Sequence, residues 1–335
     1  MEPDSHLAIV IPAFKARFLE ASLRSIAAQT DQTFHLYVCD DGSPEDLAAI
    51  FQRVFPGPGG NATFHRFDEN LGGRSLVQQW NRCVRLTDAT WVWLFSDDDV
   101  ADPDCVRRFR AALASDAARP ADEVYRFNTA SLDQHGRVVV LHPAHPARET
   151  AAGFAFHRLC HTRHSFAAEH LFTRRTFDRC GGFVEFPFAL GSDDASWISF
   201  CGDGEIVLIE GAYVYWRTSP LNTSLLGGRQ LGEKLLGLHR FSLWMAERAG
   251  RAPFAPNTLL GTLDPKHLAS EWFVQQLHHI RQFVAPLEIE RIADALARQT
   301  GLSQGYFRSK LWISNFRFLT SSLLQFGKRL VKKTP

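Results

Sequence analysis

Short apolar runs alternate with longer amphipathic stretches through the first hundred residues of the chain. Each run is rich in β-branched or aromatic residues and ends in a turn signal, which indicates a strand, and the stretches between the runs repeat apolar residues at helical spacing. This alternation predicts an α/β domain with a doubly wound, mostly parallel central sheet. The expected strands are Leu7 to Ile11, Phe34 to Cys39, Thr63 to Phe67 and Trp91 to Phe95, and the expected helices are Phe14 to Ala28, Glu45 to Phe55 and Ser75 to about Leu86.

The fourth apolar run is followed almost directly by acidic residues. Trp91 to Phe95 is followed by Ser96 and three consecutive aspartates, Asp97 to Asp99. In open α/β sheets the ligand crevice forms at the carboxyl ends of the strands. Adjacent carboxylates repel one another, and a hard cation such as Mn²⁺ or Mg²⁺, holding a diphosphate, would remove this repulsion. The alternative is an acidic turn before the next helix, because Asp-Pro-Asp at 102–104 is itself a helix-start signal.

Two earlier strand ends carry turn and polar residues to the same edge. The first is Pro12-Ala13-Phe14, and the second is Asp40-Asp41-Gly42-Ser43. The segment Asn70 to Arg74 adds two glycines and an Arg before a helix, and backbone amides at a helix start beside an Arg can accept a phosphate. Asn-x-Gly-Gly is also an ordinary turn, so both interpretations of this segment stay open.

The order and spacing of these segments together resemble the inverting family-2 glycosyltransferases of the A-type fold. The matching segments are Ile11 to Phe14, Ser25 to Thr30, Asp40 to Ser43, Asn70 to Asn81 and Asp97 to Asp99. The resemblance covers residues 6–110 and extends more loosely to about residue 224. It implies a catalytic domain over residues 1–224, with a nucleotide-binding half at about 6–110 and an acceptor half at about 111–224.

The resemblance also implies which residues hold a nucleotide-sugar donor. In the family, the ends of the first two strands hold the nucleobase and ribose. That role falls on Pro12, Phe14, Asp40 and Asp41. Arg74 lies at the family's nucleotide-facing helix start.

The acidic motif of the family binds the ribose and the metal on the diphosphate. That role falls on Asp97, Asp98 and Asp99, with Asp98 the favoured metal ligand and Asp99 the next. The usual pattern is Asp-x-Asp-Asp, and Ser96 stands where the first Asp would be. Lys15 to Arg17 replace the acidic residue that usually follows the first strand.

The acceptor half carries a second acidic pair, Asp193-Asp194, after Gly191-Ser192 and before an apolar helix pattern. From the residues alone, a helix cap is the better interpretation of this pair. In the resembled family the second acid of such a pair takes the proton of the acceptor hydroxyl, which implies Asp194 as the base and Asp193 as the residue that orients acceptor or base. Attack opposite the leaving diphosphate inverts the anomeric carbon. Arg217 either assists this leaving group or stacks structurally beside Tyr215 and Trp216.

Further strands are expected in the acceptor half. Val124 to Leu141 predicts an antiparallel pair, and the other expected strands are Glu169 to Phe172, Ile206 to Ile209 and Ala212 to Trp216. Between them, His157, Cys160, His161 and His164 have offsets that would share one helical face, which a zinc site could use. No second ligand cluster is nearby in the sequence, and the alternative is a helix near the acceptor entrance.

After about residue 225 the apolar residues follow helical spacing, which predicts a helical region over 225–335. The expected helices are Leu231 to Ala249, Pro265 to Val284 and Leu287 to Gln299. The tail, Lys310 to Lys333, combines an apolar aromatic stripe with a basic end. Such a tail can lie on an anionic membrane surface, or it can pack as a last helix.

Composition limits the classes of partner and compartment. The 335 residues include 37 Lys and Arg and 36 Asp and Glu, a net charge of +1, so no global field favours nucleic acid. The six cysteines are scattered without a Cys-x-x-Cys pair, which indicates reduced thiols. The start, Met1 to His6, lacks the basic and apolar parts of a secretory signal, and no apolar run is long enough to span a membrane. We therefore expect a cytoplasmic protein, with the tail allowing contact with the inner face of the membrane.

The resemblance implies a metal-dependent glycosyltransferase. It would move a sugar from a nucleotide-diphospho-sugar, with UDP favoured on family frequency, to a hydroxyl of a glycan or lipid-linked glycan in bacterial surface polysaccharide synthesis. One alternative is a metal-dependent nucleotidyltransferase or phosphatase, which would need phosphate-cradling glycines that Pro12-Ala13-Phe14 does not offer. Another is a non-catalytic nucleotide-sugar-binding protein, which the presence of both acidic sites disfavours.

Overall fold

The structure is a computed structural model that describes residues 6–57, 60–115, 124–160, 162–219, 231–249, 273, 285–313 and 315–316. The chain divides into two compact units, residues 1–185 with 191–220, and residues 186–190 with 221–335. The first unit holds the strands β1 (Leu7–Ala13), β2 (Phe34–Asp40), β3 (Ala62–Arg66), β4 (Trp91–Leu94), β5 (Val100–Ala101), β6 (Val124–Leu132), β7 (Val138–Leu141), β8 (Arg148–Thr150), β9 (His170–Thr173) and β10 (Glu205–Arg217). Its helices are α1 (Ala16–Ala27), α2 (Leu47–Val54), α3 (Leu76–Val84), α4 (Cys105–Ser115), α5 (Ala151–Leu159), α6 (Arg174–Arg179) and α7 (Ser192–Cys201), with a 3-10 turn η1 (Ala167–Glu169).

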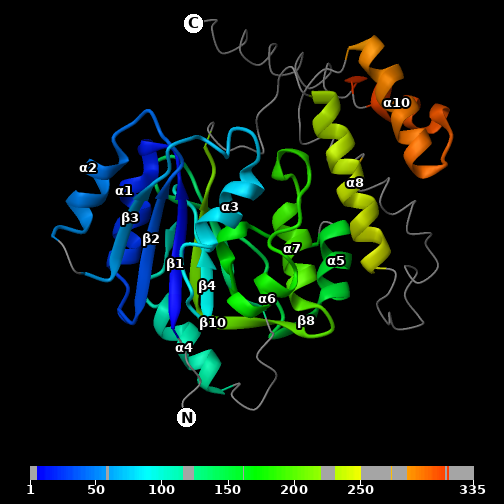
Figure 1. Ribbon diagram of the computed structural model, residues 1–335. Coiled ribbons are helices and arrows are strands. Elements are labelled where there is room, and N and C mark those ends of the chain that lie inside the picture. The colour runs from blue at the N-terminus through cyan, green and yellow to red at the C-terminus, as the bar shows by residue number, and fades with distance from the viewer. Residues whose placement is uncertain are drawn as a thin grey trace, which may run out of the picture. The chain divides into compact units, whose positions relative to one another are not determined.

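These strands form one mixed, mostly parallel sheet in the order β3-β2-β1-β4-β9-β6-β10-β5 (Figure 1). β7 pairs with β6, and β8 pairs with β10. β3, β2, β1 and β4 are parallel, β9 runs antiparallel between β4 and β6, and β6 is parallel to β10. The carboxyl ends of β1, β2, β4, β6 and β10 therefore lie at the same edge, which confirms the predicted α/β class.

Helices cover both faces of this sheet, because the central strands are apolar on both sides. In β1, Leu7, Ile9 and Ile11 pack in one core with residues of α1, α2 and α4. The alternate residues Ala8 and Val10 are equally buried on the other face, which α3 covers. This burial on both sides explains why the strand has no alternating pattern.

Two expected boundaries shift for identifiable reasons. The first helix begins at Ala16 rather than Phe14, because the amides of Phe14 and Lys15 bind the carboxylate of Asp97, in the turn after β4, instead of joining the helix. The two strands expected at Ile206 to Ile209 and Ala212 to Trp216 are one strand, β10. Its register with β6 shifts between Ile209 and Tyr213, where Gly211 has a φ of 80° that glycine adopts without strain.

The second unit is helical where it is described. It contains a short turn η2 (Pro187–Ala189), α8 (Leu231–Ala249) and α10 (Pro286–Thr300), which match two of the expected helices. Phe186 packs against Phe241 and Trp244 of α8. The helix expected at Pro265 to Val284 lies outside the described residues apart from Phe273, and so does the tail beyond residue 316. Within the described ranges, every helix is too short or too polar to cross a membrane.

Candidate active site

The aspartate turn after β4 is tied to the ends of two other strands. Asp97 Oδ2 accepts hydrogen bonds from the backbone N–H groups of Phe14 (3.0 Å) and Lys15 (3.1 Å), just past β1. Asp99 Oδ1 accepts one from the backbone N–H of Arg217 (2.9 Å), the last residue of β10. The turn is thus held by backbone donors from two strands that are far apart in the sequence.

Burial and mutual repulsion perturb these carboxylates. Burial, followed by the charge of Asp98, raises the pKa of Asp97 to about 6. The same two causes raise the pKa of Asp99 well above its usual range. Asp98 itself is half-buried, and its Oδ1 accepts a hydrogen bond from Ser96 Oγ. Ser96, the departure from the family pattern, therefore orients the neighbouring carboxylate.

The donor set of this turn fits a hard divalent cation. It supplies carboxylate oxygens only, and the raised pKa values show that a counter-charge is favourable there. Among the described residues no group of three or more His, Cys, Asp or Glu side chains forms a metal cage. A cation held by one or two carboxylates and by the phosphates of a ligand is compatible with this finding.

The two aspartates at the end of β2 are committed to internal contacts. Asp40 accepts from the backbone N–H of Ser43 (2.8 Å) and pairs with Arg66. Asp41 accepts from the backbone N–H groups of Leu71 (2.9 Å) and Gly72 (2.8 Å). Both carboxylates are buried, so they shape the loops at this edge.

Asp41 also pairs with Arg82 of α3, whose guanidinium lies 3.8 Å from the centre of the Phe67 ring. Arg74, by contrast, points to solvent. Its side chain is 66% exposed and pairs with Glu69, which is 65% exposed. Ser75 caps α3 through the backbone N–H of Gln78 (3.1 Å). The segment before α3 thus has an ordinary capped turn, with the Arg74–Glu69 pair exposed at its surface.

The second acidic pair opens α7. Asp193 and Asp194 lie in its first turn, after Gly191, whose φ is 78°. Asp194 is buried, and its Oδ2 pairs with Arg158 Nε of α5 (2.8 Å). Asp193 is half-buried, and burial together with the charge of Asp194 raises its pKa to about 7.

Behind Asp194 lies a buried network of charged side chains that the sequence did not reveal. Arg158 Nη1 donates to the carbonyl of Arg163 (3.0 Å), and Arg163 pairs with Glu149. Arg126 of β6 pairs with the other oxygen of Glu149 (2.7 Å). The one available signal was Arg126 itself, an Arg inside an apolar strand. Its partners are scattered over the sequence, so no motif linked them.

Glu169 extends this network toward β9. Its Oε1 lies 3.4 Å from Nε2 of His145, and both side chains are buried. Burial raises the pKa of Glu169 to about 8 and lowers that of His145 to about 3. The two groups are therefore neutral partners at neutral pH, with a protonated carboxyl facing an unprotonated imidazole.

Arg217 contacts the aspartate turn with its side chain as well as its backbone. Its guanidinium donates to the carbonyls of Asp98 (2.7 Å) and Asp133 (3.3 Å) and lies 4.7 Å from the centre of the Phe18 ring. Arg217 is buried. Through these contacts it holds the aspartate turn in place.

The zinc-like spacing does not form a shared helical face. α5 ends at Leu159, Cys160 is its C-cap and His164 lies beyond the helix end. His157 contacts Thr162 Oγ1 (2.7 Å), and His161 lies outside the described residues. The alternative expectation of a helix here is confirmed over Ala151–Leu159.

Residues 8–166 match the family described as Glycosyl transferase family 2. They span β1 to α5, including the aspartate turn. This part of the chain, slightly less than half of its length, is similar to glycosyltransferase family 2. The match agrees with the resemblance seen in the order of the strand-end segments.

Relatives of the chain include the PGL/p-HBAD biosynthesis glycosyltransferases of Mycobacterium bovis BCG and Mycobacterium tuberculosis. Each is 34% identical over 119 residues, which are 35% of this chain and 44% of the relative. The chain thus spans less than half the length of these curated relatives.

The fold is similar to that of S. aureus TarS. The structure of TarS 1-349 in complex with UDP matches with a TM-score of 0.57 and 13% identity, over 96% of this chain and 92% of that one. The same fragment in complex with UDP-GlcNAc matches with a TM-score of 0.58. At this identity the likeness establishes the fold.

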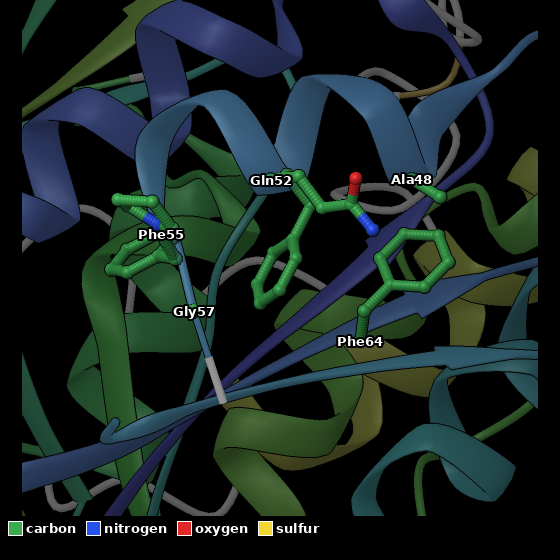
Figure 2. Close-up of a pocket in the computed structure, with 7 residues that line it drawn as sticks. Ala48, Gln52, Phe55, Gly57 and Phe64 are labelled. Atoms are coloured by element: carbon green, nitrogen blue, oxygen red, sulfur yellow. The ribbon is translucent and has the colours of Figure 1, made fainter. Parts of the chain in front are cut away.

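A hollow of about 500 Å³ lies away from this family-2 site, between α2 and the outer strand β3 (Figure 2). No ionisable side chain lines it. Its lining residues are Ala48, Phe51, Gln52, Phe55, Pro56, Gly57 and Phe64. This hollow offers an apolar surface but none of the groups that the transfer chemistry needs.

Proposed function

We propose that this chain is a metal-dependent inverting glycosyltransferase. It transfers a sugar from a nucleotide-diphospho-sugar, with UDP the favoured nucleotide, to a hydroxyl of a glycan or lipid-linked glycan. The observation that carries the proposal is that the first unit holds two separate carboxylate sites, Asp97 to Asp99 after β4 and Asp193-Asp194 in the first turn of α7. Transfer needs two such sites. The negative charge of the leaving diphosphate must be stabilised, whereas the attacking hydroxyl must lose its proton.

The donor would lie along the ends of β1, β2 and β4. Pro12, Phe14 and Asp40 border the place of the nucleobase and ribose. Asp41 holds the loop that faces them, and Arg74 is exposed and able to swing toward a phosphate. The similar fold of TarS, which forms complexes with UDP and with UDP-GlcNAc, supports a uridine nucleotide.

Asp98, with Asp99 next, would hold Mn²⁺ or Mg²⁺, and Asp97 would face the ribose. When bound, the cation supplies positive charge against the diphosphate. The chain's own contribution is orientation. Ser96 positions Asp98, and the backbone of Arg217 holds Asp99.

Asp194 would act as the base, and Asp193 would orient it or the acceptor. A sugar hydroxyl is a weak nucleophile, and a positioned carboxylate that takes its proton as the new bond forms makes it reactive. Arg158 fixes one oxygen of Asp194, which leaves Oδ1 for this role. Because the hydroxyl attacks from the side opposite the diphosphate, the configuration at the anomeric carbon inverts.

The remaining assignments are also proposals. Residues 1–224 would form the catalytic domain, and residues 225–335 a helical region whose basic tail contacts the cytoplasmic face of the membrane. The relatives named for PGL/p-HBAD biosynthesis favour an acceptor in cell-surface glycan or glycolipid assembly. Bacterial surface polysaccharide synthesis fits this class of acceptor.

The first test is calorimetric titration of the protein with UDP, with Mn²⁺ and then with a chelator. We expect binding that depends on metal and is lost in Asp98→Asn. Asp88→Asn, an exposed aspartate before β4, is the matched control and should bind as the parent does. If the parent binds neither UDP nor any other nucleoside diphosphate in the presence of Mn²⁺ or Mg²⁺, the proposal is wrong.

A second measurement addresses the base. Slow release of UDP from a UDP-sugar in water reports donor turnover without an acceptor. Asp194→Asn should keep UDP affinity and lose transfer activity. Asp193→Asn should retain part of the transfer activity. Products cleaved between the two phosphates would instead indicate a nucleotidyltransferase or phosphatase.

A further inference from the structure

Four rings gather beyond the carboxyl ends of β6 and β10. Trp216 and Phe166 stack with their centres 4.7 Å apart and their planes 18° apart. His142 lies 5.4 Å from Phe166 and 4.7 Å from His164, and His164 is nearly parallel to Phe166 at 6.2 Å. We call these four residues the aromatic platform.

The aromatic platform is assembled from three separate segments and is held by polar anchors. Trp216 is on β10, His142 directly follows β7, and His164 and Phe166 precede η1. Ser131 Oγ contacts His142 Nε2 (2.8 Å), and the backbone N–H of Phe166 donates to Glu169 Oε2 (3.2 Å). Ser131 also lies opposite Trp216 in the register of β6 and β10. The rings are therefore fixed in orientation, although all four are at least partly exposed.

On one side, the aromatic platform is connected to the aspartate turn. Trp216 immediately precedes Arg217, whose backbone N–H binds Asp99 and whose guanidinium binds the carbonyl of Asp98. On the other side, it is connected to the second acidic pair. The segment that carries His164 and Phe166 begins at Arg163, whose carbonyl is held by Arg158, the partner of Asp194. The segments that carry the rings are thus linked to both carboxylate sites, through Arg217 on one side and Arg158 on the other.

We propose that the aromatic platform is the acceptor subsite, where it stacks against an uncharged pyranose ring of the acceptor. This inference rests on the proposed function, and it specifies the chemical class of the acceptor unit next to the reacting hydroxyl. Flat aromatic faces with polar edges suit a sugar ring, which has an apolar C–H face and a rim of hydroxyls.

The environment of His142 favours an uncharged ligand at this place over an anionic one. Burial, followed by the proximity of His164 and His145, lowers the pKa of His142 to about 4, so its imidazole is neutral at neutral pH. A phosphate or carboxylate group would require a cationic partner. A neutral imidazole can instead exchange hydrogen bonds with sugar hydroxyls.

The test compares Trp216→Leu and Phe166→Leu with the parent. The matched control is Phe51→Leu in α2, which breaks another partly exposed ring pair, Phe51 with Phe55. Phe51 also contacts Phe64 of β3, at the other end of the sheet from β10. The probes are methyl hexopyranosides, which are uncharged, and the assay is the acceleration of UDP release from a UDP-sugar. UDP affinity, release in water and melting temperature are measured on every variant.

We expect at least one neutral hexopyranoside to accelerate UDP release by the parent. Loss of one stacking contact should raise its half-saturating concentration roughly tenfold in both platform variants, with UDP affinity and release in water unchanged. Trp216→Phe, which keeps a ring, should recover most of this affinity, and Phe51→Leu should match the parent.

An unchanged half-saturating concentration in the platform variants, or no acceleration by any neutral sugar, overturns the inference. So does acceleration only by sugars that carry a phosphate or carboxylate. If the parent neither binds UDP nor releases it from a UDP-sugar, the proposed function itself fails, and the two failures are thereby distinguished.

Discussion

Replacing Asp41 with Asn tests whether this residue acts through the loop before α3. The carboxylate accepts from the backbone N–H groups of Leu71 and Gly72 and pairs with Arg82. An Asn side chain has the same shape but carries one NH₂ group. Whichever way the amide turns, at least one of these donors loses its acceptor and faces another donor.

The cost can be worked out from these contacts. The less costly orientation keeps Leu71 and Arg82 on the oxygen and leaves the N–H of Gly72 unpaired. A hydrogen bond to a charged group contributes about 2 kcal/mol, and losing the charge opposite Arg82, whose side chain is 20% exposed, costs about 1 kcal/mol more. The sum is about 3 kcal/mol. For a unit of this size it corresponds to a melting temperature lower by about 6–12 °C.

Thermal denaturation with and without UDP is the assay. The matched control is Glu69→Gln in the same loop, which breaks an exposed pair with Arg74 and should cost less than about 0.5 kcal/mol. Well below its melting temperature, Asp41→Asn should bind UDP within roughly threefold of the parent, a factor that corresponds to less than 1 kcal/mol. A melting temperature within about 2 °C of the parent, together with a large loss of UDP affinity, would refute the reasoning and make Asp41 a direct nucleotide ligand.

Three further predictions follow from the first unit. Because the raised pKa of Glu169, about 8, favours its protonated form in the folded state, its contribution to stability is fully present below pH 4.5 and is lost as the pH rises toward 8. The melting temperature should therefore fall from pH 6.5 to 8, and Glu169→Gln should flatten that fall. Gly182→Ala should destabilise by about 2 kcal/mol or more, since its φ is 105° and a Cβ would lie 2.5 Å from an amide oxygen, whereas Gly181→Ala meets no neighbour and should cost about 1 kcal/mol in a denaturant titration. Arg158→Gln should cost about 3 kcal/mol by leaving Asp194 buried without its partner, and adding Asp194→Asn should recover part of that loss in a double-mutant cycle.

The sequence predicted the placement of Asp97 to Asp99 and Asp40-Asp41 better than the surroundings of Asp193-Asp194. Asp97 to Asp99 and Asp40-Asp41 follow strands whose apolar runs are unambiguous, so their edge of the sheet was predictable from parallel pairing alone. The order of those segments also indicated the resemblance to family-2 glycosyltransferases. What it did not determine was the direction of each side chain, and Arg74 points to solvent while Arg217 turns onto the backbone of Asp98.

The surroundings of Asp193-Asp194 depend on contacts between segments that have no fixed spacing. Arg158 meets Asp194 across 36 residues, and Arg126 meets Glu149 across 23. No periodicity links such pairs, because they come together only when α5, α7 and β6 pack. The aromatic platform arises in the same way, with Trp216 reaching Phe166 through the pairing of β10 with β6.

By itself, therefore, the sequence determined the strand order along the chain, the class of the fold and the residue types available at the carboxyl edge. Local apolar periodicity and turn chemistry act over a few residues, and these features are local. Only the tertiary structure decided which carboxylates are committed to loops, which stay accessible and which charges are buried in pairs. Those properties depend on burial and on partners from distant segments, which come together only when the sheet and its covering helices have packed.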